Sequence, residues 1–220
     1  MMFEDRDAYT VAELEARKEI GALDPPLAAA ERGVEFDQAE HRFRVAVLGE
    51  NVSVGFPGGE VTGDGGRRLS GAVAVIALHY LTHRGEPLHS RGWLAYRDMP
   101  GGRDFSRTFE SMAEARLAGH FGDEPQEFQR SALAMGGAGG DVGKFSFVIN
   151  ALPRLPLMLV LWPACEELGG GARILFRPSA PYYLHTEDLA ALGVVTAERL
   201  MGLSEGPGDV EESTRKDDNR

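Results

Sequence analysis

The chain has 220 residues, of which 43% are hydrophobic, and a formal net charge of −11 at pH 7. This length supports one sizeable hydrophobic core and does not require two domains. The two ends, residues 1–24 and 205–220, together carry thirteen acidic and six basic residues, which leaves a net charge of −4 on the rest. Because nucleic-acid binding requires concentrated positive charge, we expect no nucleic-acid partner.

Targeting and redox features favour a cytoplasmic protein. Cys165 is the only cysteine, so an internal disulfide and a cysteine-rich iron–sulfur or zinc centre are excluded within this chain. The first residues lack the positively charged start and apolar run of a secretory signal. The apolar runs are shorter than the roughly 20 residues that span a bilayer, so we expect no membrane association.

The beginning of the chain predicts two short helices. We predict an N-terminal extension over residues 1–22 that is partly helical. Asp24, followed by Pro25, indicates the start of a second helix. This helix is expected to end at Gly33, because glycine readily adopts the positive φ of a helix terminus.

Two further patterns predict a small sheet and a buried helix. Apolar and polar residues alternate over 34–61, which is typical of antiparallel strands joined by tight turns. The segment 69–85 is apolar nearly all round, so we predict a helix in the middle of the core. The remaining predicted elements are a strand over 93–97, helices over 105–121 and 124–135, strands over 144–150, 156–162 and 172–176, and a helix capped by Thr186.

Strands and helices are segregated along the chain rather than alternating, which indicates an α+β fold. We predict a single domain over residues 23–203, with antiparallel sheets packed against the buried central helix and several surface helices. Residues 204–220 are polar and acidic. They contain too little apolar surface to order themselves, so we predict a disordered tail.

A set of short motifs is similar to a known family. The motifs are RGV at 32–34, LHYL at 78–81, YRDMPGG at 96–102, LPRLP at 152–156, ILF at 174–176 and YLHTEDL at 183–189. Together, over residues 31–200, they resemble a prokaryotic family described as domain of unknown function 3786. The resemblance implies a cytoplasmic domain of anaerobic bacteria and archaea with no established activity.

The chain departs from the family pattern in three respects. Some members resemble electron-transfer or corrinoid-associated proteins because they carry an added cysteine cluster. This chain lacks that cluster, which argues against a direct redox role. His185 stands where such sequences usually have proline, and Arg177 stands where an acidic residue is common.

The stretch 153–189 is the most informative for function, because an apolar strand runs directly into polar groups. Arg154 lies in a stiff, proline-flanked segment, and a rigidly held guanidinium suits recognition of a carboxylate or phosphate. The structural alternative is that the arginines pair with acids inside the domain. We expect a small-ligand-binding or accessory domain that takes an anionic or aromatic-bearing ligand. The residues predicted to line the pocket are Tyr80, Arg97, Arg154, Trp162 and Tyr183.

An enzyme is the competing hypothesis. In this reading His79 acts with Glu166 or Glu167 in proton transfer on the bound ligand. His79 equally fits a buried histidine satisfied by a hydrogen bond. Glu187 and Asp188 have a structural explanation as acidic residues in the first turn of a helix.

Metal and nucleotide sites have weaker support. The spacing of His79, His83, Glu86 and His89 resembles that of metal ligands, but the surrounding helix is apolar and the HExxH glutamate is missing, so we expect no metal site. The glycine-rich segment 136–141 follows a helix and precedes a strand, the reverse of a nucleotide-binding loop. We therefore expect no covalently bound cofactor and no iron–sulfur cluster.

A third possibility is an interaction partner of corrinoid or iron–sulfur enzymes in anaerobic metabolism. Such a protein would use its acidic surface and tail to bind its partner.

Overall fold

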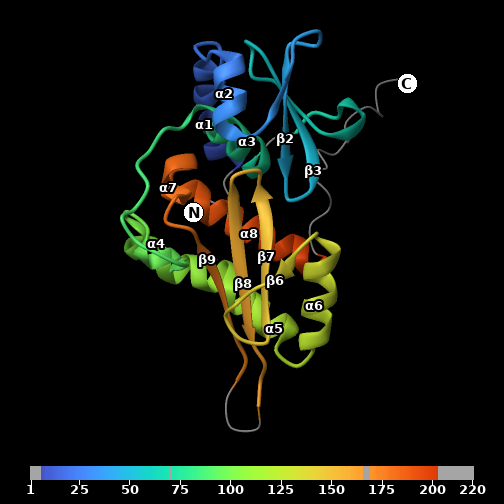
Figure 1. Ribbon diagram of the computed structural model, residues 1–220, viewed down its shortest axis with the longest axis vertical. Coiled ribbons are helices and arrows are strands. Elements are labelled where there is room, and N and C mark those ends of the chain that lie inside the picture. Colours follow the sequence, from blue (N-terminus) through green and yellow to red (C-terminus); the bar gives the residue numbers. More distant parts are fainter. Residues whose placement is uncertain (1–5, 70, 166–168, 203–220) are drawn as a thin grey trace, which may run out of the picture.

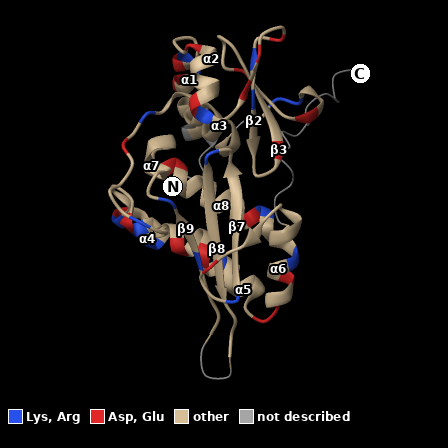
Figure 2. Cartoon of the chain, viewed as in Figure 1, with Lys and Arg blue, Asp and Glu red and all other residues tan. Residues whose placement is uncertain are grey.

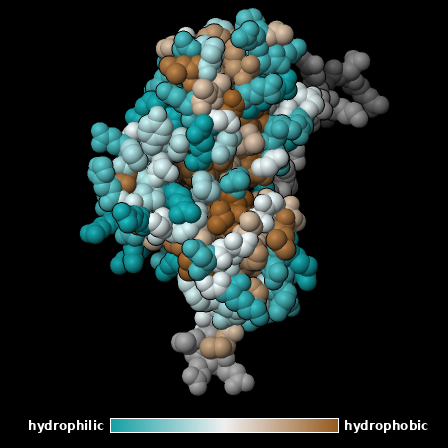
Figure 3. All heavy atoms as spheres, viewed as in Figure 1, coloured by the Kyte–Doolittle hydropathy of each residue, from teal (hydrophilic) through white to brown (hydrophobic). Residues whose placement is uncertain are grey.

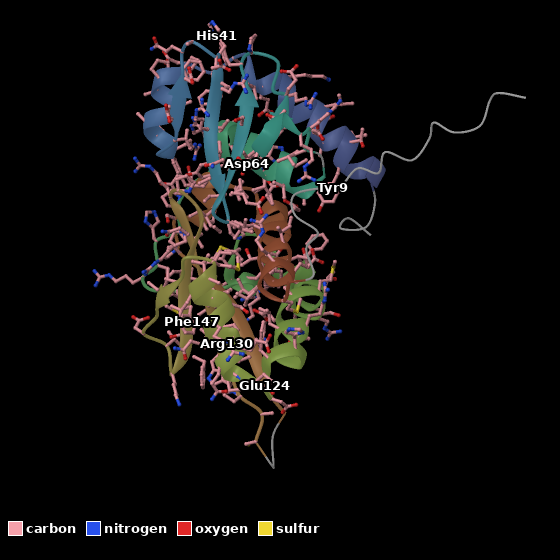
Figure 4. The ribbon with its side chains drawn as sticks, turned by 90° about the vertical axis from the view of Figure 1, so that its right-hand side faces the viewer. Tyr9, His41, Asp64, Glu124, Arg130 and Phe147 are labelled. Carbon is pink, nitrogen blue, oxygen red and sulfur yellow. The ribbon has the colours of Figure 1, made fainter. Side chains whose placement is uncertain are left out.

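The computed structural model describes residues 6–69, 71–165 and 169–202. Within these residues the chain forms two antiparallel sheets and a set of helices around one continuous core, which confirms the predicted single α+β domain. The molecule is elongated. His41 marks the end formed by the first sheet, and Glu124 and Arg130 lie toward the opposite end (Figure 4).

The first sheet is the predicted meander, with the strand order β1-β2-β3-β4. Its strands are β1 (Glu35–Asp37), β2 (Arg42–Val47), β3 (Glu50–Gly55) and β4 (Val61–Thr62). Along β2 the side chains of Phe43, Val45 and Val47 are buried and those between them face outward. This is the burial pattern that a period of two predicts.

Helix α2 (Pro25–Arg32) leads into this sheet and has the predicted ends. The backbone N–H of Leu27 donates to the Asp24 carboxylate at 3.1 Å. Gly33 ends the helix with a φ of 66°. A Cβ at Gly33 would lie 3.0 Å from Nε of Arg154, so glycine also allows the second sheet to approach here.

The second sheet has the order β5-β9-β8-β7-β6. Its strands are β5 (Leu94–Ala95), β6 (Ala138–Gly139), β7 (Phe145–Leu152), β8 (Leu155–Trp162) and β9 (Gly171–Phe176). β7 and β8 carry no charged side chain (Figure 2). Apolar side chains reach the surface over these strands (Figure 3). The predicted strand over 93–97 is shorter in the structure, because Tyr96–Asp98 forms a 3₁₀ turn.

The remaining helices surround the two sheets. They are α1 (Arg6–Ile20), α3 (Ala72–Thr82), α4 (Gly102–Phe109), α5 (Ala115–Phe121), α6 (Pro125–Ala134), α7 (Ala180–Tyr183) and α8 (Thr186–Leu200). A π-helical segment, Glu110–Glu114, joins α4 to α5. The short helix α7 was not predicted from the sequence.

Helix α3 is the predicted buried helix, and seven of its residues, from Ala74 to Leu81, are buried. It packs against α1, α2 and α8 and against the first sheet. The sheets join where the N–H of Leu48 donates to the carbonyl of Ala151 at 2.8 Å. Helix α8 crosses behind the second sheet (Figure 1). Helix α8 also packs against α3, and its start lies close to the C-terminal end of α3.

The structure describes most of the predicted N-terminal extension but not the predicted C-terminal tail. Helix α1 packs against α3, and its residues Ala16 and Ile20 are buried, so this part of the predicted extension contributes to the core. The predicted tail over 204–220 lies outside the described residues. Among the described residues, no helix has both the length and the apolar character needed to cross a bilayer.

Candidate functional site

The C-terminal half of α3 places two adjacent side chains in different clusters. His79 is directed toward the start of α8, where Asp188 lies. Tyr80 is fully buried and is directed toward the end of α2 and the turn between β7 and β8. Both residues belong to the LHYL motif, so this motif contributes to two separate clusters of side chains.

His79 and Asp188 form a close pair. Nδ1 of His79 lies 2.8 Å from Oδ2 of Asp188, and Asp188 is 8% exposed. The carboxylate lies in the first turn of α8, where the positive end of the helix dipole stabilises a negative charge. Burial disfavours the charged form of His79, but the hydrogen bond and charge of Asp188 outweigh this effect and raise the pKa of His79.

Two further histidines complete what we call the histidine cluster, namely His79, His83, His185 and Asp188. The ring of His185 lies 3.9 Å from that of His83 and 5.3 Å from that of His79, measured between ring centroids. Nε2 of His83 lies 3.0 Å from the carbonyl oxygen of Pro181. Burial lowers the pKa of His83, so this imidazole is neutral near pH 7 and can donate to that carbonyl.

A hollow of about 450 Å³ opens beside the histidine cluster. Its walls come from the segment that follows α3, from the loop before α4, and from α7 and the start of α8. The lining residues are His83, Gly85, Glu86, Pro87, Leu88, His89, Pro100, Pro181, Leu184, His185 and Thr186. The hollow therefore combines imidazole groups with proline and leucine side chains.

Hydrogen bonds to backbone carbonyls hold these walls together. The N–H of Leu88 donates to the carbonyl of Pro178 at 2.8 Å. The hydroxyl of Thr186 donates to the carbonyl of Pro100 at 2.7 Å. Thr186 was predicted to cap α8, and this prediction is wrong. The capping position is His185, and the Thr186 hydroxyl instead ties α8 to the loop before α4.

Arg32 forms the centre of the second cluster. It is completely buried, and its guanidinium lies 5.1–5.8 Å from the ring centroids of Tyr80, Tyr182 and Tyr183. It donates to the carbonyls of His83 and Tyr182. Burial lowers the pKa of Arg32. The carbonyls occupy both terminal nitrogens of the guanidinium, the tyrosine rings compensate its charge, and its Nε has no hydrogen-bond partner among the described residues.

Three of the predicted pocket residues meet at the Arg32 cluster. The hydroxyl of Tyr80 donates to the carbonyl of Arg32 at 2.6 Å and accepts from the N–H of Arg154 at 3.0 Å. The Arg154 guanidinium donates to the carbonyl of Ala30 at 3.0 Å. The Tyr80 and Tyr183 rings lie 5.8 Å apart. These polar groups are engaged with the protein itself, and the sequence analysis missed Arg32, around which they gather.

The other two predicted pocket residues lie elsewhere. Arg97 lines a small hollow of about 100 Å³ with Tyr96 and Arg173. Trp162, 48% exposed, lines a hollow of about 700 Å³ between α5 and the ends of β8 and β9. Glu166 and Glu167 lie outside the described residues.

An ion pair between the buried Glu114 and the partly exposed Arg173 lines both of these hollows. Glu114 accepts from the Arg173 guanidinium at 2.7 Å and from the N–H of Ile174 at 3.0 Å. Burial raises the pKa of the Glu114 carboxyl, although both hydrogen bonds and the charge of Arg173 oppose this. The pair connects the π-helical segment to β9.

Arg177 also has a defined position. Its guanidinium stacks 3.8 Å from the centroid of the Trp93 ring. This departure from the family pattern therefore supports the segment that follows α3 and leaves the histidine cluster unaffected.

Comparison with known proteins identifies the family. The sequence matches Domain of unknown function (DUF3786) over residues 24–199. The chain belongs to this family. No curated protein and no solved structure matches the chain at a significant level.

The motifs that suggested the DUF3786 family converge in space. RGV contributes Arg32, LHYL contributes His79 and Tyr80, and LPRLP contributes Arg154. TEDL contributes Asp188 in the first turn of α8, and His185, which departs from the family pattern, lies directly before this helix. Residues from four of these motifs therefore lie close together around the end of α3 in this DUF3786 domain.

Proposed function

We propose that this DUF3786 protein binds a small organic anion in the hollow beside the histidine cluster. The observation that supports this most directly is the position of His83 and His185 in the wall of a 450 Å³ hollow, next to the His79–Asp188 pair. A volume of this size lies within the range of small-molecule sites.

The chemistry of the walls supports a carboxylate attached to an apolar body. The exposed imidazole of His185 has an N–H that can donate to a carboxylate oxygen, whereas the N–H of neutral His83 already donates to the carbonyl of Pro181. A hydrogen bond to a carboxylate is charge-assisted and stronger than a neutral one. The side chains of Pro87 and Leu88 offer apolar contact. A ligand with one acidic group and a compact apolar part satisfies both surfaces.

The Arg32 cluster has a supporting role in this proposal. Arg32 donates to the carbonyls of His83 and Tyr182, which flank the hollow. Tyr80, Arg154 and Tyr183 surround Arg32, so these predicted pocket residues act by positioning α7 and the end of α3. Arg97 and Trp162 take no part in ligand binding at this hollow.

Benzoate is a suitable probe, and benzyl alcohol is its control because it has the same ring and no carboxylate. We expect benzoate to shift the imidazole NMR signals of His83 and His185 in a saturable manner, and benzyl alcohol to bind far more weakly. His185→Ala should weaken benzoate binding, whereas His120→Ala, an exposed histidine on α5, should leave it unchanged. Equal binding of both compounds, or no effect of His185→Ala, would exclude carboxylate recognition at this hollow.

The enzymatic alternative is tested by following the compounds that bind. Conversion of a bound compound by the wild-type chain would make the protein an enzyme rather than a binding protein. The alternative of a corrinoid or iron–sulfur enzyme partner predicts complex formation that is lost when residues 204–220 are deleted. Our proposal places the protein in the cytoplasm of an anaerobic prokaryote, as the single cysteine and the family resemblance favour.

A further inference from the structure

We propose that His79, His185 and Asp188 bind one divalent transition-metal ion of the zinc type beside the hollow. Each of these residues offers one ligand atom, and the ligand atoms lie within 4.8 Å of one another. They come from α3, from the first turn of α8 and from the residue directly before it. The proposal replaces the expectation that the chain has no metal site, which rested on the apolar helix around His79 and His83 and on the missing HExxH glutamate.

The distances suit a shared ion. Ligand bonds of about 2.0–2.2 Å in tetrahedral geometry place neighbouring ligand atoms about 3.3–3.6 Å apart. Nδ1 of His79 and Oδ2 of Asp188 are already 2.8 Å apart, so an ion can bridge them after a small separation. His185 is exposed, and its side chain is therefore free to close the remaining distance by rotation about χ1 and χ2.

The donor set selects the class of metal. Two imidazole nitrogens and one carboxylate oxygen are the ligands of catalytic zinc sites and suit zinc, cobalt and nickel better than calcium or magnesium. His83 is not counted among the ligands, because its Nε2 lies 3.0 Å from the carbonyl oxygen of Pro181.

Two carboxylates act on His79 and favour a dication there, whereas the Arg32 cation acts on His83, at the other side of the cluster. The charge of Glu19, on α1, acts on His79 together with that of Asp188. Asp188 also acts on Tyr9 of α1, whose pKa is raised to about 12 mainly by burial; Tyr9 is labelled in Figure 4. Helix α1 thus covers one side of the site, and the hollow leaves the side of His185 open.

Three protein ligands leave a fourth position for water or another ligand, as in catalytic zinc sites. The carboxylate of a bound organic anion can occupy that position. This second step rests on the proposed ligand-binding function, whereas metal binding itself does not. The metal site is therefore tested with the metal alone.

The experiment uses the full chain without a histidine tag, stripped of metal by a chelator and then titrated with Co²⁺. We expect saturation at one Co²⁺ per chain, with the strong visible absorption of a four- or five-coordinate ion, and loss of this absorption when Zn²⁺ is added. Zn²⁺ binding measured by calorimetry should give the same stoichiometry.

Matched variants locate the ion. His185→Ala and Asp188→Asn should each weaken Co²⁺ binding by at least about tenfold, since loss of even an outer-shell partner typically costs 10–100-fold. His89→Ala, which removes an exposed histidine of the same hollow, and His120→Ala on α5 should bind Co²⁺ as the wild type does. His185 is exposed, so His185→Ala should keep the wild-type melting temperature and decides the question if Asp188→Asn does not fold.

The absence of saturable Co²⁺ binding would overturn the proposal, and so would wild-type affinity in His185→Ala. Titration of benzoate into the stripped and the metal-loaded protein separates this proposal from the proposed function. Metal binding without benzoate binding leaves the metal site and removes the ligand site. Benzoate binding without metal binding leaves the ligand site and removes the metal site.

Discussion

His79 and Asp188 are 109 positions apart in the sequence, and their side chains meet at 2.8 Å between Nδ1 and Oδ2. The pair joins the C-terminal end of α3 to the first turn of α8. Both residues are largely buried, so the bond forms in a medium of lower dielectric than water and is stronger than a surface pair. It also fixes the orientation of the His79 ring beside His185.

Replacing Asp188 tests how much this bond contributes to stability. Asp188→Ala removes a charge-assisted hydrogen bond and leaves His79 without its partner, so we expect a loss of about 2–3 kcal/mol in the free energy of unfolding. Glu187→Ala is the matched control, because Glu187 is the exposed neighbour in the same helical turn. Urea unfolding measures both. Equal losses in the two variants would mean that helix-dipole effects account for the result.

Arg32 is expected to be essential for folding. Arg32→Met removes the hydrogen bonds of a charged donor to the carbonyls of His83 and Tyr182, and each such bond contributes about 1.5–3 kcal/mol. We therefore expect a total loss of about 3 kcal/mol or more. Arg44→Ala is the control, since Arg44 pairs with Asp37 at the surface, where the two side chains are 49% and 22% exposed, and pairs of this kind contribute little to stability. A wild-type melting temperature for Arg32→Met would contradict a structural role.

Glu114 should make stability depend on pH. Its pKa is raised in the folded state, mainly by burial, so the folded protein holds this proton more tightly than the unfolded chain does. Stability from this group is complete below the ordinary carboxyl pKa and falls as the pH rises through the raised value. The free energy of unfolding of Glu114→Gln should therefore increase relative to that of the wild type across this pH interval.

Urea unfolding at several pH values between 4 and 7 measures that difference. Glu110→Gln is the control, because Glu110 also approaches Arg173, at 3.5 Å, but is 56% exposed. If the difference in unfolding free energy between Glu114→Gln and the wild type stayed constant with pH, the Glu114 carboxyl would titrate alike in the folded and the unfolded chain.

Two glycines in helices should respond in opposite ways to alanine. A Cβ at Gly193 of α8 would lie 2.5 Å from the ring of Phe109, so Gly193→Ala forces α8 away from α4 and should cost about 1–3 kcal/mol. A Cβ at Gly119 of α5 meets no atom within 4 Å. Gly119→Ala should therefore stabilise the protein by about 0.5–1 kcal/mol. Thermal unfolding of the two variants should move in opposite directions, and a stabilised Gly193→Ala would refute the close packing.

The sequence was most informative where short-range rules apply. The cap at Asp24, the end of α2 at Gly33, the alternation along β2 and the apolar run of α3 each depend on residues a few positions apart. Local rules were wrong for Thr186, because its hydroxyl has a competing acceptor, the carbonyl of Pro100, which lies 86 positions away.

The candidate site shows the limit of this reasoning. His79 was predicted to act in proton transfer with Glu166 or Glu167, which lie outside the described residues, and the structure shows Asp188 as its hydrogen-bond partner. Asp188 had a sufficient explanation as a first-turn helix charge, so its sequence position carried no signal of a second role. Arg32 was missed for a similar reason, since an arginine at the end of a helix is ordinarily solvated.

The sequence by itself determined the fold class, the family, the buried central helix and the motifs that matter, because these depend on composition, periodicity and local spacing. Only the tertiary structure decided which motifs meet. The packing of α8 beside α3 brings His79, His185 and Asp188 together, and the burial of α2 places Arg32 among the tyrosines. Such contacts arise from how whole elements fill one core, and the free energy of that packing is distributed over the entire chain.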